Sequence, residues 1–492
     1  MSENHKLPIY GEKILSAKQM SLFEKQLVKK SPDLAEVFMD SAAMGMFNVL
    51  KKRVLEKSSR KNIVLLIGKG NNGADAYTLG SLLVQSGWEV EAFALFKETS
   101  ELSAKRAEAF HRDGGRIHLV KTITDFSLPE NCIVIDGLLG TGCTGGVFGL
   151  LAEVVEKVNS SECFVFSIDI ASGVDGNTGL VQGNAICADV TAYLGALKVG
   201  HLFEKGLEYS GVFHYVDFGL DCSSLEAKYY LFNANELQSR LPKRSLLGNK
   251  YDVGQVVALC GNSSMKGAAE LCCRAAYRAG CGIVRHFYLG DAPCSMNEVI
   301  TQKMSIELFD KELYRTKAIV IGPGLGRDEE AKAVVKYVLQ ITDIAMVIDA
   351  DALFLLETPP MHAILTPHRG ELLRLLGMGK DSQDEQIHQA AQCYADKFSV
   401  TIIFKGVPTV IFSPRGKKIV IVSGNPGMSS GGTGDVLAGI VASFLAQGAN
   451  PLDAASLGVT VHGKAADLAA TFLSERYMVA SDIINYLSKV FL

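Results

Sequence analysis

Short runs of β-branched and apolar residues alternate along the chain with longer segments in which apolar residues recur every three or four positions. In the first half these runs predict strands at residues 62–67, 90–95, 132–135, 163–168 and 190–194. Such alternation is typical of βα units, so we expect an α/β domain with a Rossmann-like, doubly wound parallel sheet. Most of these strands end in a glycine-rich or acidic turn, where ligands bind in open α/β sheets.

The second half repeats the alternation after an interruption. Residues 218–252 are polar and irregular, and then further strands are predicted at 254–259, 318–321, 345–348, 400–404, 410–412 and 418–422. A chain of 492 residues exceeds one ordinary core, so two domains are expected, both α/β. We place the junction near residues 225–240, which gives domains 1–225 and 226–492.

Composition narrows the class of protein. The 49 basic and 53 acidic residues nearly balance, without the basic excess of a nucleic-acid-binding protein, and this favours small-molecule chemistry. Eleven cysteines without a CxxC pair suggest reduced thiols in a cytoplasmic protein. The N-terminal residues lack the apolar core of a secretory signal and no segment has 18 consecutive apolar residues, so no membrane association is expected.

The most informative segment is a glycine-rich loop that leads into an apolar helix. Residues 424–435 read GNPGMSSGGTGD, and the helical sequence VLAGIVASFLAQG follows Asp435 at once. Backbone N–H groups of such a loop and the positive end of the helix dipole form an anion hole for a phosphoryl group. A carboxylate beside this hole can accept the proton of an attacking hydroxyl. The alternative is that Asp435 only caps the helix.

Five further motifs accompany this loop in the second half. They are GNSSMKGAAELCCRAAYRAGCGIV from Gly261, GPGLG at 322–326, DADAL at 349–353, LTPHRGEL at 365–372 and KGVPTVI at 405–411. Together they resemble the ADP- or ATP-dependent NAD(P)H-hydrate dehydratases, a family of the ribokinase-like superfamily. Such enzymes phosphorylate the hydroxyl of a hydrated nicotinamide ring and then eliminate it, which restores the reduced cofactor.

The resemblance implies a ribokinase-like α/β fold and a set of site residues. Asp435 would be the catalytic base and Gly434 part of the anion hole, with Mg²⁺ and either ADP or ATP as co-substrate. The remaining implied contacts are Lys405, Gly406, Val407, Pro408 and Thr409 for the nucleotide, and Ala268, Gly324, His368 and Asp435 for the hydrate. His368 could instead cap a turn behind Pro367. The spacing of Asp349 and Asp351 suggests that one faces the site and the other faces solvent, and neither is assigned a catalytic role.

The first half carries a second glycine loop, Gly68-Lys-Gly-Asn-Asn-Gly73, between a predicted strand and helix. It matches the GxGxxG dinucleotide pattern, but no acidic residue lies suitably at the end of the next strand, which disfavours a redox Rossmann domain. Later strand ends supply Asp136, Asp169 and Ser172. Carboxylate, amide and hydroxyl oxygens without nearby histidine or cysteine suit a hard cation better than zinc.

This second set resembles the NAD(P)H-hydrate epimerases, which interconvert the two epimers of the same hydrate and hold K⁺. The similarity covers about residues 15–220, and its order before the dehydratase motifs resembles the family of bifunctional NAD(P)H-hydrate repair enzymes. Asp169 is the candidate acid/base, although it could be a buried acid that caps a turn. By resemblance the K⁺ ligands are Asn72, Asp136 and Ser172, and the hydrate contacts are Asn71, Asn72, Gly73, Ala74, Asp75, Gly140, Thr141, Gly142, Cys143, Thr144, Gly145, Gly146 and Asp169.

The epimerase-like half departs from the family pattern, because NNGGDG is NNGADA here and IDIPSG is IDIASG. If Ala74 occupied a left-handed backbone position, its methyl group would strain the site. Two alternatives therefore stay open: a ribokinase-like vitamin kinase, and an N-terminal half that is a catalytically silent binding module. The substrates implied by the resemblance are NADHX and NADPHX, and a symmetrical homo-oligomer is a general expectation for such enzymes.

Overall fold

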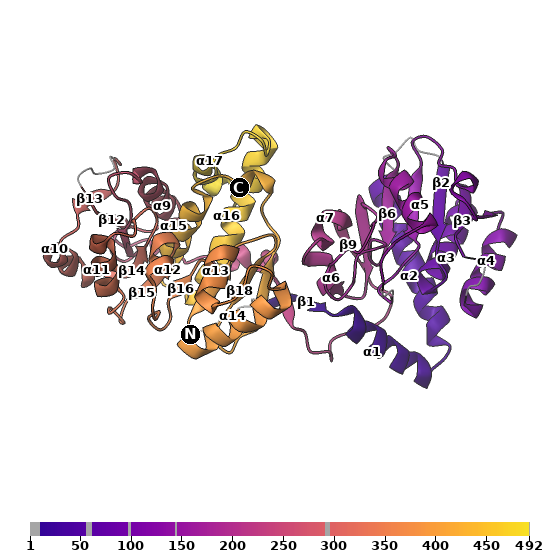
Figure 1. The fold of residues 1–492 in the computed structure, drawn as a ribbon, viewed down its shortest axis with the longest axis horizontal. Helices are drawn as coiled ribbons and strands as arrows, with labels where there is room; N and C mark the ends of the chain where they lie inside the picture. Colours follow the sequence, from indigo (N-terminus) through magenta and orange to yellow (C-terminus); the bar gives the residue numbers. More distant parts are fainter. Residues whose placement is uncertain (1–9, 56–61, 97–99, 143–144, 291–295, 492) are drawn as a thin grey trace. The chain divides into compact units, whose positions relative to one another are not determined.

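The computed structural model describes residues 10–55, 62–96, 100–142, 145–290 and 296–491. The chain divides into two compact units, residues 13–228 and residues 229–492, and residues 10–12 belong to the second unit (Figure 1). Both units are mixed α/β, as the hydrophobic pattern predicts. Cys143 and Thr144 lie outside the described residues.

Unit 13–228 contains a parallel sheet with strand order β4-β3-β2-β5-β6-β7-β9. The order reverses direction between β2 and β5, so the loops that follow these two strands diverge to opposite faces of the sheet. The strands are β4 (Arg116–Leu119), β3 (Glu89–Ala94), β2 (Asn62–Ile67), β5 (Ile133–Gly137), β6 (Phe164–Ile168), β7 (Val190–Leu194) and β9 (Val212–Val216).

Both faces of this sheet are covered by helices. Alternate side chains of β2 enter different cores: Ile63 and Leu65 pack with α2 (Leu34–Leu50) and α3 (Asn71–Gln85), whereas Val64 and Leu66 pack with α5 (Leu150–Asn159). Burial on both faces explains why β2 reads as an unbroken apolar run. The five strands predicted in this half are confirmed as β2, β3, β5, β6 and β7.

In unit 229–492 the strand order is β13-β12-β11-β14-β15-β16-β17-β18-β19-β10. Strands β17, β18 and β19 pair antiparallel, and the remaining pairs are parallel. The strands are β13 (Ile300–Lys303), β12 (Ile283–Tyr288), β11 (Gln255–Leu259), β14 (Thr316–Ile321), β15 (Ala345–Ile348), β16 (Ile364–Leu365), β17 (Thr401–Phe404), β18 (Thr409–Phe412), β19 (Lys418–Ile421) and β10 (Tyr229–Phe232).

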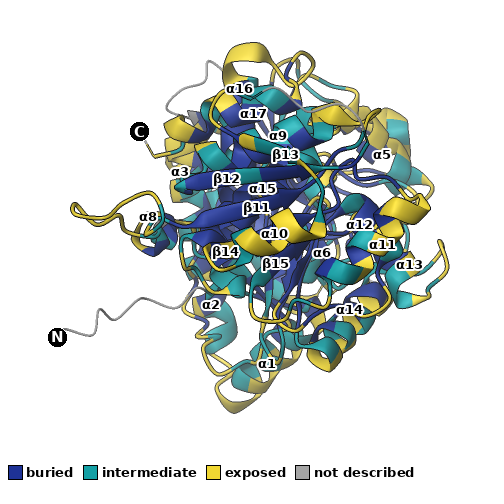
Figure 2. Ribbon diagram, turned by 90° about the vertical axis from the view of Figure 1, so that its left-hand side faces the viewer, coloured by how far each residue is buried: buried dark blue, intermediate teal, exposed yellow. Residues whose placement is uncertain are grey.

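Helices α9 (Lys266–Arg278), α15 (Thr433–Ala446) and α16 (Pro451–Leu473) share one core with this sheet. The central strands β11, β12 and β14 are almost wholly buried in Figure 2. Helices α9 and α15 approach closely, since a Cβ on Gly439 would lie 2.1 Å from the carbonyl oxygen of Cys272. This contact fixes the start of α15, where Asp435 lies, against the rest of the unit.

One expectation is wrong in detail. Residues 218–252 are not irregular throughout, because they contain β10 and the short helix α8 (Leu237–Arg240). A four-residue strand is too short to produce a clear hydrophobic period, although β10 pairs with β19 inside the sheet. Within the described residues, no helix is long and apolar enough to cross a membrane.

Candidate active sites

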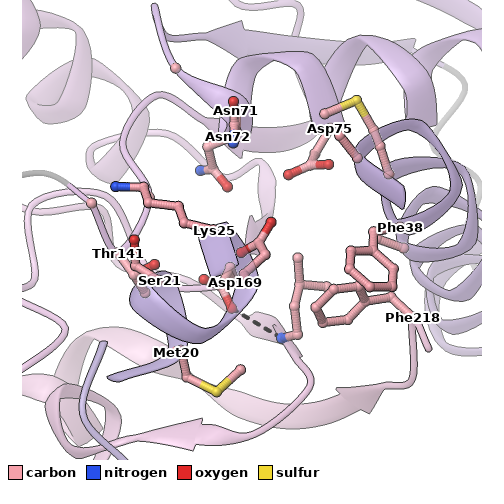
Figure 3. A pocket seen from close by; sticks show the side chains of 18 of the residues that line it. Met20, Ser21, Lys25, Phe38, Asn71, Asn72, Asp75, Thr141, Asp169 and Phe218 are labelled. Atoms are coloured by element: carbon pink, nitrogen blue, oxygen red, sulfur yellow. Dashed lines mark hydrogen bonds between the residues drawn. The ribbon is translucent and has the colours of Figure 1, made fainter. Parts of the chain in front are cut away.

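A cavity of about 650 Å³ opens in unit 13–228 at the carboxyl ends of its strands. Its lining comes from α1 (Ala17–Lys30), α2, the start of α3 and the turns after β5, β6 and β7. Figure 3 shows Asn71, Asn72, Asp75 and Asp169 arranged around this space. The strand order reverses between β2 and β5, so the cavity lies where ligands bind in doubly wound sheets.

The first glycine loop places the two asparagines at this cavity. A Cβ on Gly73 would lie 2.3 Å from the carbonyl oxygen of Gly68, so no larger residue fits there without a backbone shift. Asn71 and Asn72 thereby occupy the first turn of α3 and line the cavity. Ala74 is buried inside α3 and is not among the residues with positive φ, so its methyl group causes no backbone strain.

The three residues predicted to bind a cation converge on the turn after β5. Asp136 accepts hydrogen bonds from the Ser172 hydroxyl (2.5 Å), the Ser172 N–H (2.9 Å) and the Ser167 hydroxyl (2.8 Å). The Ser172 hydroxyl and the Asn72 amide nitrogen each lie 3.1 Å from the Leu139 carbonyl oxygen. The oxygens of Asp136, Ser172 and Leu139 form a compact set that the Asn72 amide contacts, and no basic side chain of the described residues pairs with buried Asp136.

Asp169 lies at the centre of a buried polar network. Its backbone is left-handed, with φ of 62°, which is rare outside glycine and frequent at functional sites. Its carboxylate is paired with the Nζ of Lys198, while its carbonyl oxygen lies 2.7 Å from the Nε2 of His201. Burial by itself raises the pKa of Asp169, but the Lys198 ammonium outweighs burial and holds the pKa below its ordinary value.

Two participants in this site were missed in the sequence. Glu24 of α1 and Lys198 of β8 (Leu197–Lys198) both line the cavity, and Lys198 is only 2% exposed. A lysine inside the apolar segment LGALKVG is the one signal that could have marked it, since buried lysines are rare unless paired.

The remaining predicted hydrate contacts divide into two groups. Gly140, Thr141 and Gly142 line the cavity, and a Cβ on Gly140 would lie 3.3 Å from the Asn72 side chain. Gly145 and Gly146 belong to the turn beyond them and are not part of the lining. A Cβ on Gly146 would meet the Gln182 carbonyl oxygen at 2.7 Å, so this glycine is explained by close packing.

In unit 229–492 Asp435 stands in the first turn of α15. The helix begins after Gly432, whose φ of 93° turns the glycine loop into the helix. Burial raises the pKa of Asp435 to about 7, with a further increase from the nearby Asp349 carboxylate and an opposing effect of Lys405. A carboxyl group with this pKa is suited to accept a proton near neutral pH.

Lys405 and Asp349 form an ion pair beside Asp435. The Nζ of Lys405 is 2.9 Å from the Oδ1 of Asp349, which also accepts a hydrogen bond of 2.7 Å from Thr366. A Cβ on Gly434 would lie 3.2 Å from the same Nζ, so the ammonium is close to the anion hole. Burial lowers the pKa of Lys405, but Asp349 and then Glu371 outweigh burial and raise it, which keeps the ammonium charged.

The expectation that one of Asp349 and Asp351 faces solvent is wrong. The two residues are 1% and 9% exposed. Asp351 accepts hydrogen bonds from the Gly326 N–H (3.0 Å) and the Arg327 Nε (2.7 Å), so it holds the loop after β14 in place. The alternation of a strand does not apply, because Asp351 belongs to α12 (Ala350–Leu355).

The other predicted contacts of this half surround the same strand ends. Gly324, with φ of 61°, packs against Ala268, since a Cβ on it would lie 2.9 Å from that of Ala268. His368 caps α13 (Arg369–Leu376): its Nδ1 accepts a hydrogen bond of 3.0 Å from the Gly370 N–H, and its side chain is 61% exposed. In the segment after Lys405, Gly406 and Val407 are exposed, Pro408 is buried, and Thr409 donates a hydrogen bond to the Gly406 carbonyl.

Two family profiles match the chain. One described as NAD(P)H-hydrate dehydratase matches residues 256–489, and one described as YjeF-related protein N-terminus matches residues 35–200. The chain is 30% identical over 488 residues to the bifunctional NAD(P)H-hydrate repair enzyme Nnr of Moorella thermoacetica, and the match covers 92% of both chains. It is 33% identical over 439 residues to the Escherichia coli (strain K12) protein of the same name, covering 87% of this chain and 84% of the relative.

Among solved structures, an ADP/ATP-dependent NAD(P)H-hydrate dehydratase from Bacillus subtilis, co-crystallised with ATP/Mg²⁺, is similar at 28% identity and a TM-score of 0.47. The match covers 53% of this chain and 97% of that one. A ribokinase-like superfamily protein from Enterococcus faecalis matches at 27% identity and a TM-score of 0.48, covering 54% and 98%.

Proposed function

Because the chain belongs to the family of bifunctional NAD(P)H-hydrate repair enzymes, we propose that its two sites divide the family's two activities between the two units. Unit 13–228 would epimerise the R and S hydrates of NADH and NADPH, and unit 229–492 would dehydrate the S hydrate. The family predicted from the motifs is confirmed. The vitamin-kinase alternative is set aside, because the matches extend over both halves of the chain.

The observation that carries the dehydratase assignment is the carboxyl of Asp435 at the start of α15, with a pKa of about 7 and the Lys405–Asp349 pair beside it. Asp435 would take the proton of the ring hydroxyl as the hydroxyl oxygen bonds to the terminal phosphorus of the nucleotide. The bond from that phosphorus to the bridging oxygen breaks, and AMP or ADP leaves. Elimination then breaks the C–O bond of the phosphate ester, releases phosphate and the neighbouring C–H proton, and restores the ring double bond. Lys405 and the backbone of Gly434 would stabilise the charge of the transferred group.

Three assignments follow for the ligands of this unit. Lys405, Gly406, Val407, Pro408 and Thr409 would contact ADP or ATP, and Ala268, Gly324 and His368 the hydrate. The exposed side chain of His368 supports its assignment; capping uses its Nδ1, and its Nε2 lies 3.4 Å from the Glu371 carboxylate. The described residues contain no group of three acidic, histidine or cysteine side chains placed to hold a metal ion. We therefore propose that Mg²⁺ binds with the nucleotide, whose phosphates supply most of its ligands and whose charge it neutralises.

In unit 13–228 Asn72, Asp136 and Ser172 would hold K⁺, with the Leu139 carbonyl as a further oxygen. The convergence of these side chains supports this proposal, as does the buried carboxyl of Asp136, which accepts hydrogen bonds but has no basic partner among the described residues. The cation would supply positive charge beside the hydrate. The ordinary helical backbone at Ala74 argues against the silent-module alternative, because the substitution leaves the cavity intact.

The division of labour is tested on the full chain with and without nucleotide. Without nucleotide, purified R hydrate should equilibrate with S hydrate, faster in K⁺ than in Na⁺, while no reduced cofactor forms. Asp136→Asn should abolish the difference between the two salts. Equal rates in K⁺ and Na⁺ would reject the cation assignment, and no equilibration in either salt would reject the epimerase assignment.

A further inference from the structure

We propose that Asp75 and Asp169 form a proton donor and acceptor pair in the cavity of unit 13–228, with Asp75 protonating the departing hydroxyl of the hydrate. This proposal rests on the proposed epimerase function and deepens it. Asp75 enters the cavity from α3 and Asp169 from the end of β6, and both carboxyls point into the same space in Figure 3.

The two carboxyls have different partners. Asp169 is held by Lys198, and its position is fixed further by a hydrogen bond of 3.0 Å from the Leu194 N–H. Asp75 is 9% exposed, and no hydrogen bond or ion pair to its carboxyl is found within the described ranges. A buried carboxyl that faces a cavity without a partner is available to a ligand.

The charges around Asp75 favour its protonated form. Glu24 of α1 and Asp169 are the nearby acids, and the lysines at the exposed rim of the cavity are Lys25, Lys29 and Lys69. Of the bases, Lys198 is engaged by Asp169, and Arg106 of α4 (Glu101–Arg112) is paired with Asp40 of α2 at 2.7 Å. Three carboxyls therefore share one buried ammonium, so they cannot all be ionised at low cost.

Burial, and then the charges of Asp169 and Glu24, raise the pKa of Asp75 well above its ordinary value, whereas the pKa of Asp169 is lowered. A pair of acids with pKa values displaced in opposite directions is the arrangement that general acid–base catalysis requires. Glu24 also has a raised pKa, mainly from burial, but it is partly exposed to water and lies nearer the rim.

The chemistry of the hydrate requires such a pair. Hydration of an enamine double bond places the hydroxyl on the carbon next to the ring nitrogen, so the epimers differ at that carbon. Asp75 gives its proton to the hydroxyl, the C–O bond breaks, water leaves, and the nitrogen lone pair forms a C=N⁺ bond. A water molecule then adds to the opposite face of that carbon and gives a proton to the Asp169 carboxylate.

One turnover therefore moves a proton from Asp75 to Asp169 and exchanges the hydroxyl oxygen with solvent. In the reverse direction Asp169 donates and Asp75 accepts, which restores the starting state. No oxidant, reductant or further reactant is needed. The scheme also gives Lys198 a role as a positioning residue that keeps Asp169 ionised before the forward step.

The test follows exchange of purified R hydrate into S hydrate by chromatography, with K⁺ and without nucleotide. The full-length wild type should show a bell-shaped pH dependence of kcat, whose fall at high pH reports loss of the Asp75 proton. Asp75→Asn should lower kcat at least about a hundredfold and abolish that fall. Asp75→Glu should restore part of the rate. Glu89 is an exposed acid at the start of β3, so the control variant Glu89→Gln should behave as wild type. In ¹⁸O-labelled water each exchange should introduce one labelled oxygen.

Three results would overturn the proposal. If Asp75→Asn raises only KM and kcat still falls at high pH, Asp75 is a binding residue and not the proton donor. Loss of that fall in Glu24→Gln, with its retention in Asp75→Asn, would make Glu24 the donor. Exchange without uptake of label would exclude cleavage of the C–O bond. If the wild type dehydrates S hydrate with nucleotide but exchanges no epimers, the epimerase function itself fails, and the proposal fails with it.

Discussion

Replacing Asp349 by asparagine should move the pH dependence of dehydration to lower pH. Asp435 must be ionised to accept a proton, so with a pKa of about 7 the rate constant kcat/KM should rise with pH and level off above neutrality. Asp349 is the largest influence that raises this pKa after burial. Asparagine keeps an oxygen for the hydrogen bond from Thr366 but removes the charge.

The size of the shift follows from Coulomb's law. The Nζ of Lys405 lies 2.9 Å from Asp349 and close to the start of α15, and the charges of both Asp349 and Asp435 act on this ammonium. For a separation on the order of 7 Å and an effective dielectric constant of about 20, the repulsion is roughly 2 kcal/mol. That energy corresponds to a decrease of about one to two units in the pKa of Asp435.

The assay is the initial rate of cofactor recovery from S hydrate between pH 5 and pH 9 at saturating nucleotide. One pH unit below the pKa of Asp435 in the wild type, the wild-type kcat/KM should be about tenfold below its plateau. At the same pH, Asp349→Asn should keep most of its own plateau value. Lys405→Met should shift the inflection in the opposite direction, and Asp381→Asn, an exposed acid, should leave it in place. An inflection that is the same in Asp349→Asn and wild type would refute the electrostatic account of Asp435.

Two further predictions concern the glycine loops. Gly73→Ala should lower the free energy of unfolding by more than about 1 kcal/mol in thermal denaturation, because its Cβ would lie 2.3 Å from the Gly68 carbonyl oxygen; a fully stable variant would contradict this packing. Asp351→Asn weakens the ion pair with Arg327 that holds the loop after β14, so it should raise KM for the hydrate several-fold. It should also lower the pH inflection, by less than Asp349→Asn does, because Asp351 raises the pKa of Asp435 less than Asp349 does. An unchanged KM would contradict the role of Asp351 in holding that loop.

The hydrophobic pattern predicted much of both sheets because strands buried on two faces are continuous apolar runs with clear ends. β2 and β15 match their predicted ranges, whereas β10 was missed because its four residues give too little pattern. Asp435 could be predicted from sequence because its loop, the acid and the helix are contiguous.

Side chains whose role depends on distant partners could not be predicted in this way. Lys198 belongs to the candidate site because its ammonium forms an ion pair with Asp169. Asp349 belongs to the other candidate site because its carboxylate forms an ion pair with Lys405. Neither ion pair can be predicted from the local spacing of residues, because its two partners are brought together only by the crossover connections of the sheet. The consequence of alanine at position 74 also depended on the backbone, which is helical there.

The most direct test of the account is recovery of the absorbance of reduced nicotinamide from hydrated NADH, with ADP or ATP and Mg²⁺, by wild type and Asp435→Asn. The account predicts recovery that requires nucleotide and that falls by at least about a hundredfold in the folded variant. Recovery by Asp435→Asn at the wild-type rate, or none by a folded wild type that binds nucleotide, would contradict it.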